Sequence, residues 1–149
     1  MNYFIVILAT GLGVGYSPIA PGTLGTLVAI PIYYFLSAIP FPLYEITLAG
    51  FFFLAVWISE KSEAVFGKKD DPKIIIDEMM GFFITMLWVP KTTLFVIFGF
   101  ILFRFFDILK PPPIRLVERV RGGYGVVLDD VLAGVYANII LQMIYWVAG

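Results

Sequence analysis

Long apolar runs, separated by short polar or proline-containing breaks, dominate the hydrophobic pattern of the chain. A helix of about 17–25 mostly apolar residues can cross the roughly 30 Å hydrocarbon core of a bilayer, so runs of this kind predict membrane-spanning helices. The predicted spans are residues 23–39, 43–59, 74–89, 92–106 and 131–148.

Prolines and chain length define the remaining elements. The segment Ile39–Pro42 (IPFP) predicts a turn, and Pro90 ends the third span, because proline removes a helix donor and disfavours helix at the preceding residue. Residues 3–10 are too few to cross a bilayer and predict a short N-terminal half-helix. The apolar N-terminus lacks the basic region of a signal peptide, so we expect it to belong to the mature protein. The fold expected is an all-α integral membrane helix bundle, a single domain over residues 1–149, with about five spans.

The basic residues orient this bundle. Five crossings with tight turns at residues 39–42 and 89–92 leave three longer segments on the opposite side, residues 11–22, 60–77 and 104–130. These segments hold nine of the ten Lys and Arg residues, and only Lys91 lies in a turn on the other side. Since positive charge marks the cytoplasmic face, the three segments are predicted to share the cytoplasmic rim.

Composition supports a membrane protein and narrows its chemistry. Of 149 residues, 60% are apolar and 14% charged, whereas soluble domains carry roughly 25% charged residues. The net charge of −1 argues against nucleic-acid binding, which needs a basic excess. The chain has no Cys and no His, which excludes disulfides, thiolate zinc sites, cysteine nucleophiles and imidazole bases. Carboxylates, Lys, Arg and hydroxyls remain, together with a hard cation that prefers oxygen ligands.

Two acidic pairs lie at the starts of apolar spans. Asp77-Glu78 follows three isoleucines and precedes twelve uncharged residues. A carboxylate at lipid depth costs about 2.5–3.5 kcal/mol, which makes it a functional candidate. A capping and solubility cluster is the alternative, and it accounts more easily for the nearby Asp70 and Asp71 than for this pair.

The second pair, Asp129-Asp130, opens the last span. Helix capping is again the alternative, although one Asp would suffice for it. Two such pairs on one aqueous side would repel each other unless cations lay between them. Magnesium takes octahedral oxygen ligands, so we expect Mg²⁺ bound by the four carboxylates Asp77, Glu78, Asp129 and Asp130.

Basic residues lie in the adjoining segment FRFFDILKPPPIR. Arg104, Asp107 and Lys110 are spaced i, i+3, i+6 and can share a helical face. They could form an interfacial salt-bridge ladder, with Lys110 and Arg115 reaching lipid headgroups. If they lie beside the acidic pairs, these basic side chains would instead bind a phosphate that the metal also contacts.

The N-terminal segment GLGVGYSPIAPGTLGT, Gly11 to Thr26, is rich in glycine and proline. Its glycines do not match the dinucleotide-binding fingerprint. A loop of this kind leading into a helix can present backbone N–H groups and hydroxyls to a phosphate, or can simply form a re-entrant turn. Its candidate hydroxyls are Ser17, Thr23 and Thr26.

Four motifs, taken in order, resemble the signatures of the phosphatidylglycerophosphatase A family: GLGVGYSPIAPGTLGTLVAIP, DDPKIIIDEMMG, FRFFDILKPPPIR and GGYGVVLDDVLAG. They extend from Gly11 to Gly134. The resemblance implies an all-α, magnesium-dependent phosphatase of phospholipid biosynthesis in the bacterial inner membrane. Its substrate would be phosphatidylglycerophosphate and its products phosphatidylglycerol and inorganic phosphate. Lys73, where relatives often have an acidic or small polar residue, and Glu118, where Asp is common, are small departures.

The resemblance also implies which residues carry the site. The family's acidic positions fall on Asp70, Asp77, Glu78, Asp107, Asp129 and Asp130, and its basic positions on Arg104, Lys110 and Arg115. We expect Asp70 to be a further metal ligand or the base that orients water. Asp107 would support Arg104, and the segment from Ser17 to Thr26 would close over the phosphate.

Without His or Cys, phosphohistidine and phosphocysteine routes are closed. Metal-assisted attack by water and an aspartyl-phosphate route remain, and we favour water because the chain lacks a D-x-D motif on a strand end. Other functions stay open at this point: a phosphatase of polyprenyl pyrophosphate or phosphatidic acid, a small ion transporter, or a non-catalytic membrane subunit. A transporter would place acidic residues near mid-span, whereas here they gather at one end.

Overall fold

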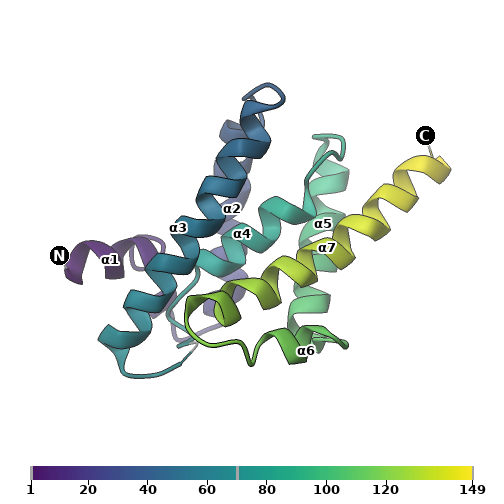
Figure 1. The fold of residues 1–149 in the computed structure, drawn as a ribbon. Coiled ribbons are helices and arrows are strands. Elements are labelled where there is room, and N and C mark those ends of the chain that lie inside the picture. Colours follow the sequence, from purple (N-terminus) through teal and green to yellow (C-terminus); the bar gives the residue numbers. More distant parts are fainter. Residues whose placement is uncertain (1, 70, 149) are drawn as a thin grey trace.

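A computed structural model describes residues 2–69 and 71–148, which form seven α-helices and one 3-10 helix (Figure 1). The all-α prediction is confirmed. The elements are α1 Asn2–Ala9, η1 Val14–Tyr16, α2 Pro21–Leu36, α3 Leu43–Phe66, α4 Ile76–Thr85, α5 Thr93–Leu109, α6 Ile114–Val117 and α7 Gly123–Ala148.

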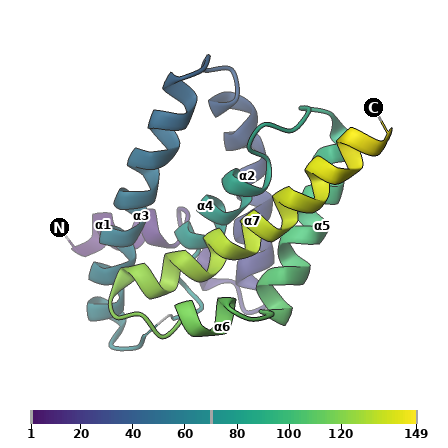
Figure 2. The same ribbon diagram turned by 45° about the vertical axis from the view of Figure 1, so that its right-hand side comes forward.

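Helices α2 and α3 are the two arms of a helical hairpin that diverge from its turn, and α2 packs against α4 (Figures 1 and 2). Pro21 is the first residue of α2, where its fixed φ suits a helix and its missing N–H costs nothing. The hairpin turn lies at residues 37–42, as the prolines predicted. The short α1 packs against α3 at the side of this hairpin, and its length matches the half-helix expected for residues 3–10.

Helix α4 is the central element of the bundle. It contacts α2, α3, α5 and α7, and the core side chains Phe82 and Phe83 are fully buried. A helix that is buried all round can be apolar all round. At 10 residues α4 is about 15 Å long, half the hydrocarbon thickness of a bilayer. The span expected over residues 74–89 is therefore a short core helix.

Side chains of α7 stabilise the C-terminal end of α4. The side-chain amide of Asn138 donates to the carbonyls of Thr85 and Leu87 at 2.9 and 2.7 Å, and Gln142 donates to Leu87 and Trp88. The last carbonyls of a helix have no partner within it, and lipid offers none. These two amides allow α4 to end inside the bundle.

Helix α7 begins at Gly123, eight residues before the predicted start of the last span. Asp129 and Asp130 are therefore inside the helix, beyond its first turn, and N-capping does not explain them. Asp130 continues the buried stripe of Ala133, Ala137 and Leu141, which faces the core.

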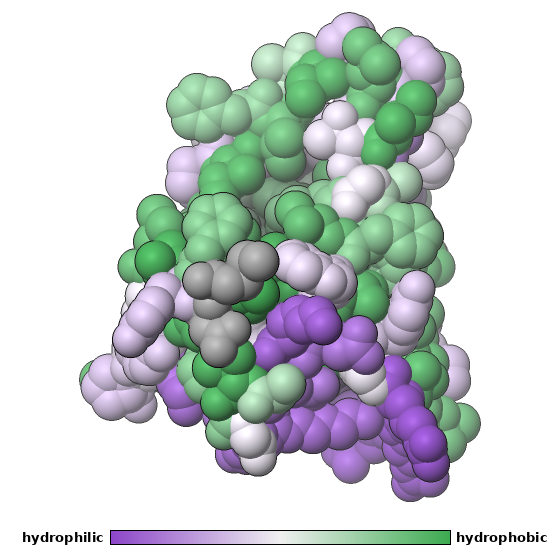
Figure 3. Space-filling view, turned by 60° about the vertical axis from the view of Figure 1, so that its left-hand side comes forward, coloured by the Kyte–Doolittle hydropathy of each residue, from purple (hydrophilic) through white to green (hydrophobic). Residues whose placement is uncertain are grey.

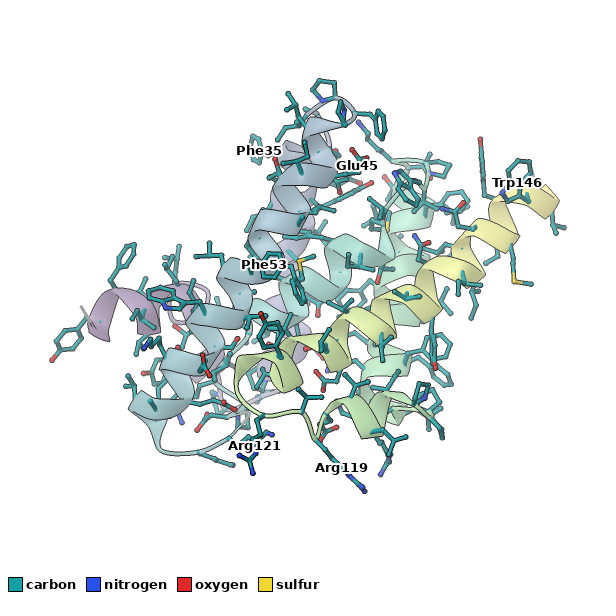
Figure 4. All side chains as sticks on the ribbon, in the orientation of Figure 1. Phe35, Glu45, Phe53, Arg119, Arg121 and Trp146 are labelled. Carbon is teal, nitrogen blue, oxygen red and sulfur yellow. The ribbon has the colours of Figure 1, made fainter. Side chains whose placement is uncertain are left out.

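Two helices, α3 and α7, are long and apolar enough to cross a bilayer. Five spans are not shown: α2 and α5 have 16 and 17 residues, and α4 has 10. The surface nevertheless divides into two ends. Figure 3 shows hydrophilic side chains gathered at the lower end and a largely apolar surface above it. Arg119 and Arg121 lie at the lower end, opposite Phe35 and Trp146 (Figure 4).

Candidate functional site

The close crossing of α4 and α7 brings the two acidic pairs together. A Cβ on Gly134 would lie 2.4 Å from the backbone oxygen of Gly81, and one on Gly81 would lie 2.8 Å from the backbone oxygen of Asp130. Contacts this short exclude any side chain, so glycine at both positions lets the two backbones touch. Each glycine lies four residues after an acid, Asp77 or Asp130, and therefore one helical turn along the same face.

The carboxylates form two overlapping groups. In each group, one oxygen per residue lies within 4.8 Å of the others. The groups share Asp130; they are Asp77, Asp129 and Asp130, and Glu78, Asp107 and Asp130.

These carboxylates are largely out of water. Asp77, Asp129 and Asp130 are 1–3% exposed, and Asp107 is 8% exposed. One oxygen each of Asp77, Glu78 and Asp130 is fully buried and has no hydrogen-bond partner among the residues that the structure describes. Buried carboxylate oxygens without partners are costly, which indicates that something else binds them.

Lys110 joins the two groups from the end of α5. Its ammonium lies 2.6 Å from Asp129 and 3.7 Å from Asp107. Burial alone would lower the pKa of Lys110, but the carboxylate of Asp129, followed by Asp107 and Asp130, raises that pKa above its ordinary value. The ammonium is therefore held charged at neutral pH.

The backbone of Lys110 is left-handed, with φ 50°, at the C-cap of α5. Glycine usually occupies this position, because a Cβ is strained there. The chain instead has a lysine whose side chain reaches Asp129. A lysine at a position with a strained backbone indicates a role for its ammonium group.

Arg104 binds Asp107 one turn earlier on α5, through a guanidinium–carboxylate hydrogen bond. Its Nε is buried and has no partner within the described part of the chain. Asp107 itself lies on the buried stripe of α5 that includes Val96 and Phe103, where an apolar residue is expected. The four-residue spacing from Phe103 to Asp107 is the sequence signal that could have placed Asp107 on the buried face of α5.

The N-terminus of α2 lies over the cluster. A Cβ on Gly22 would stand 3.1 Å from Oε1 of Glu78 and 3.2 Å from both terminal nitrogens of Arg104. Gly22 was not predicted as a site residue, because a glycine among many in a loop carries no distinguishing signal. Its place next to both charges brings the first turn of α2 to the site, and the N–H groups that begin a helix can bind anions.

The three predicted hydroxyls differ in their surroundings. Thr26 is buried and donates to the carbonyl of Gly22 at 2.9 Å, a bond within the helix. The hydroxyl of Ser17 forms a local turn with the backbone of Ile19. Thr23, half-buried, lies in the first turn of α2 next to Gly22. A phosphate role for each of them stays a prediction.

Arg115 and Asp70 are the two remaining predicted site residues. The exposed Arg115 donates from Nε to the backbone oxygen of Lys110 at 3.3 Å, so it lies at the rim. Asp70 lies outside the described residues. Its neighbour Asp71 is buried and pairs with Lys73 at 3.1 Å. Burial alone would raise the pKa of Asp71, but the backbone N–H and ammonium of Lys73 outweigh it and lower that pKa.

The donor set fits a hard divalent cation. All candidate ligands are carboxylate oxygens, which Mg²⁺ prefers, and several of these oxygens are buried without a partner. Asp77, Glu78, Asp129 and Asp130, the four predicted ligands, all belong to the two groups. Bound there, an ion would supply positive charge to phosphate oxygens and promote ionisation of water.

The chain matches one family model and several known proteins over nearly its whole length. The family model described as phosphatidylglycerophosphatase A matches residues 7–145. A Bacteroides thetaiotaomicron protein named "Putative phosphatidylinositol-3-phosphatase" is 42% identical, covering 99% of this chain and 98% of its own. No solved structure gives a significant match.

Two further relatives carry the family's own name. Phosphatidylglycerophosphatase A of Escherichia coli is 38% identical, over 96% of this chain and 86% of its own. Phosphatidylglycerophosphatase A of Haemophilus influenzae is 39% identical, over 95% and 90%. The match covers every segment that builds the acidic cluster, and the chain belongs to the phosphatidylglycerophosphatase A family of membrane-associated lipid phosphatases.

Proposed function

We propose that this lipid phosphatase hydrolyses phosphatidylglycerophosphate to phosphatidylglycerol and inorganic phosphate, with Mg²⁺ as cofactor. The observation that carries the proposal is the buried cluster of carboxylates with unpartnered oxygens, flanked by Lys110 and Arg104. Acidic ligands for a cation next to fixed basic side chains are what a phosphomonoester requires, since its oxygens must be neutralised on several sides.

We assign a role to each residue of the site on the basis of its position. Asp77, Glu78, Asp129 and Asp130 would hold the cation. Lys110 and Arg104 would bind phosphate oxygens, the first turn of α2 would add backbone N–H donors, and Arg115 would meet the headgroup at the rim.

The reaction is a displacement at phosphorus by water. The oxygen of water forms a bond to phosphorus while the bond from phosphorus to the glycerol oxygen breaks. A carboxylate of the cluster or Asp70 takes one proton of the water and then gives a proton to the leaving glycerol oxygen, so that protons balance. Single-turnover hydrolysis in ¹⁸O-labelled water should place the label in phosphate. Label in an enzyme carboxylate would overturn direct attack by water in favour of an aspartyl-phosphate.

The placement in the membrane is also part of the proposal. The polar end with the acidic cluster would face the cytoplasm of a bacterial inner membrane, which the chain would cross several times. Support comes from the two long apolar helices and from the basic residues at that end. The phosphate headgroup would then reach the cluster from the inner leaflet.

A second substrate deserves a direct comparison, because the Bacteroides thetaiotaomicron relative is named for phosphatidylinositol 3-phosphate. Phosphate release would be measured from phosphatidylglycerophosphate, phosphatidylinositol 3-phosphate, phosphatidic acid and polyprenyl pyrophosphate in identical detergent micelles, with Mg²⁺ and with EDTA. We expect the highest kcat/KM for phosphatidylglycerophosphate, and no release in EDTA. A higher value for another lipid would replace the substrate, and release from none would reject the proposed activity.

A further inference from the structure

We propose that the cluster binds two divalent cations, bridged by Asp130, and that Asp107 is a ligand of the second. The inference rests on the proposed metal dependence and goes beyond it, since one cation and four ligands would satisfy the function above.

The carboxylates form two distinct sets of three oxygens. One set joins Asp77, Asp129 and Asp130, and the other joins Glu78, Asp107 and Asp130. Side chains of adjacent helical residues point about 100° apart, and the structure places the neighbours Asp77 and Glu78 in different sets. Asp129 and Asp130 are also neighbours, but both belong to the first set, and Asp130 alone belongs to both sets.

The buried oxygens provide an independent observation for each set. Oδ1 of Asp77 and Oδ1 of Asp130 are buried without a partner, as is Oε2 of Glu78, among the residues described. Asp77 and Asp130 are 3% and 1% exposed, so water cannot readily satisfy them. The first set thus holds unpartnered oxygens from Asp77 and Asp130, and the second from Glu78 and Asp130.

The net charge of the cluster favours two bound ions over one. The five carboxylates of the two sets face two basic side chains, Lys110 and Arg104, which leaves an excess of three negative charges in the described part of the cluster when all are ionised. One divalent ion would leave a net negative site, which repels a phosphate monoester of about −1.5 to −2 charge. Two ions would make the site positive. Paired ions about 3.5–4 Å apart are a general means of holding both the attacking and the leaving oxygen of a phosphoryl group.

Manganese binding tests the inference without reference to turnover. The purified full-length protein in micelles would be titrated with Mn²⁺, and bound ion counted per chain by electron paramagnetic resonance. We expect two ions per chain and a spin-coupled spectrum. Asp107→Asn and Asp129→Asn should each bind one uncoupled ion, and Asp130→Asn, which weakens both sets, should bind the ion at least tenfold more weakly.

Glu118→Gln is the matched control, because Glu118 contacts Lys110 at 3.6 Å as Asp107 does but belongs to neither set. It should keep two coupled ions. One ion in the wild-type protein would overturn this inference and leave the proposed function standing, whereas no bound ion would reject the metal dependence itself. Two ions that persist in Asp107→Asn would remove Asp107 as a ligand. The wild-type count does not depend on any variant folding.

Discussion

At the scale of single residues, the site contains side chains whose burial or backbone conformation lowers the stability of the fold unless they bind a ligand. Asp77 and Asp130 are almost fully buried with unpartnered oxygens, and Lys110 has a left-handed backbone that would suit glycine. Each feature reduces stability by itself. Their convergence in one cluster supports a role that depends on charge and not on packing.

Gly22 provides a test at this scale. In Gly22→Ala the new Cβ would stand 3.1 Å from Glu78 and 3.2 Å from Arg104, so both charged groups must shift by a few tenths of an ångström. Small displacements of catalytic groups reduce rates strongly, and we expect kcat/KM for phosphate release to fall roughly tenfold, with little change in the melting temperature.

Gly50→Ala is the matched control for this substitution, because a Cβ there meets nothing within 4 Å. Activity equal to wild type in both variants would mean that the first turn of α2 does not bound the site.

At the scale of helices, the crossing of α4 and α7 positions the acidic pairs. The prediction that the two pairs meet followed from their places at the starts of apolar runs on one side of the bundle. The short length of α4 could not be predicted, since an apolar run does not distinguish a lipid-exposed span from a buried helix. The amides that stabilise its end, Asn138 and Gln142, lie more than 50 residues away in the chain.

Gly134→Ala tests the crossing. Its Cβ would stand 2.4 Å from the backbone oxygen of Gly81, so α7 must move away from α4. We expect a loss of about 1–3 kcal/mol in the free energy of unfolding, together with a loss of activity as the acidic pairs separate.

In Gly50→Ala, again the control, the higher helix propensity of alanine should raise stability by up to about 1 kcal/mol. Unfolding would be followed by circular dichroism in micelles. A stable, fully active Gly134→Ala protein would show that close approach of the two helices is not required.

At the scale of the whole molecule, the face drawn in Figure 3 has a hydrophilic lower end and a largely apolar surface above it. Nine of the ten basic residues were predicted to share one side, and Arg119 and Arg121 lie at the polar end (Figure 4). The number of spans was beyond the sequence because α2 and α5 are near the lower limit of length for crossing a bilayer.

The native chain contains no cysteine, which makes its orientation directly measurable. Arg119→Cys should react with a membrane-impermeant maleimide only after bacterial cells are permeabilised, because the positive end is expected in the cytoplasm. Phe41→Cys, in the exposed α2–α3 turn, should react in spheroplasts with intact inner membranes. The reverse pattern would invert the proposed topology, and labelling of both from one side would reject it.

The central claim is that the buried acidic cluster holds the cation on which release of phosphate from a lipid depends. The most direct measurement compares phosphate release from phosphatidylglycerophosphate by the wild-type protein and Asp77→Asn, each with matched circular dichroism spectra. We predict that EDTA abolishes wild-type release, that added Mg²⁺ restores it, and that Asp77→Asn shows none at any Mg²⁺ concentration. Full activity of Asp77→Asn, or wild-type release that persists in EDTA, would contradict the account.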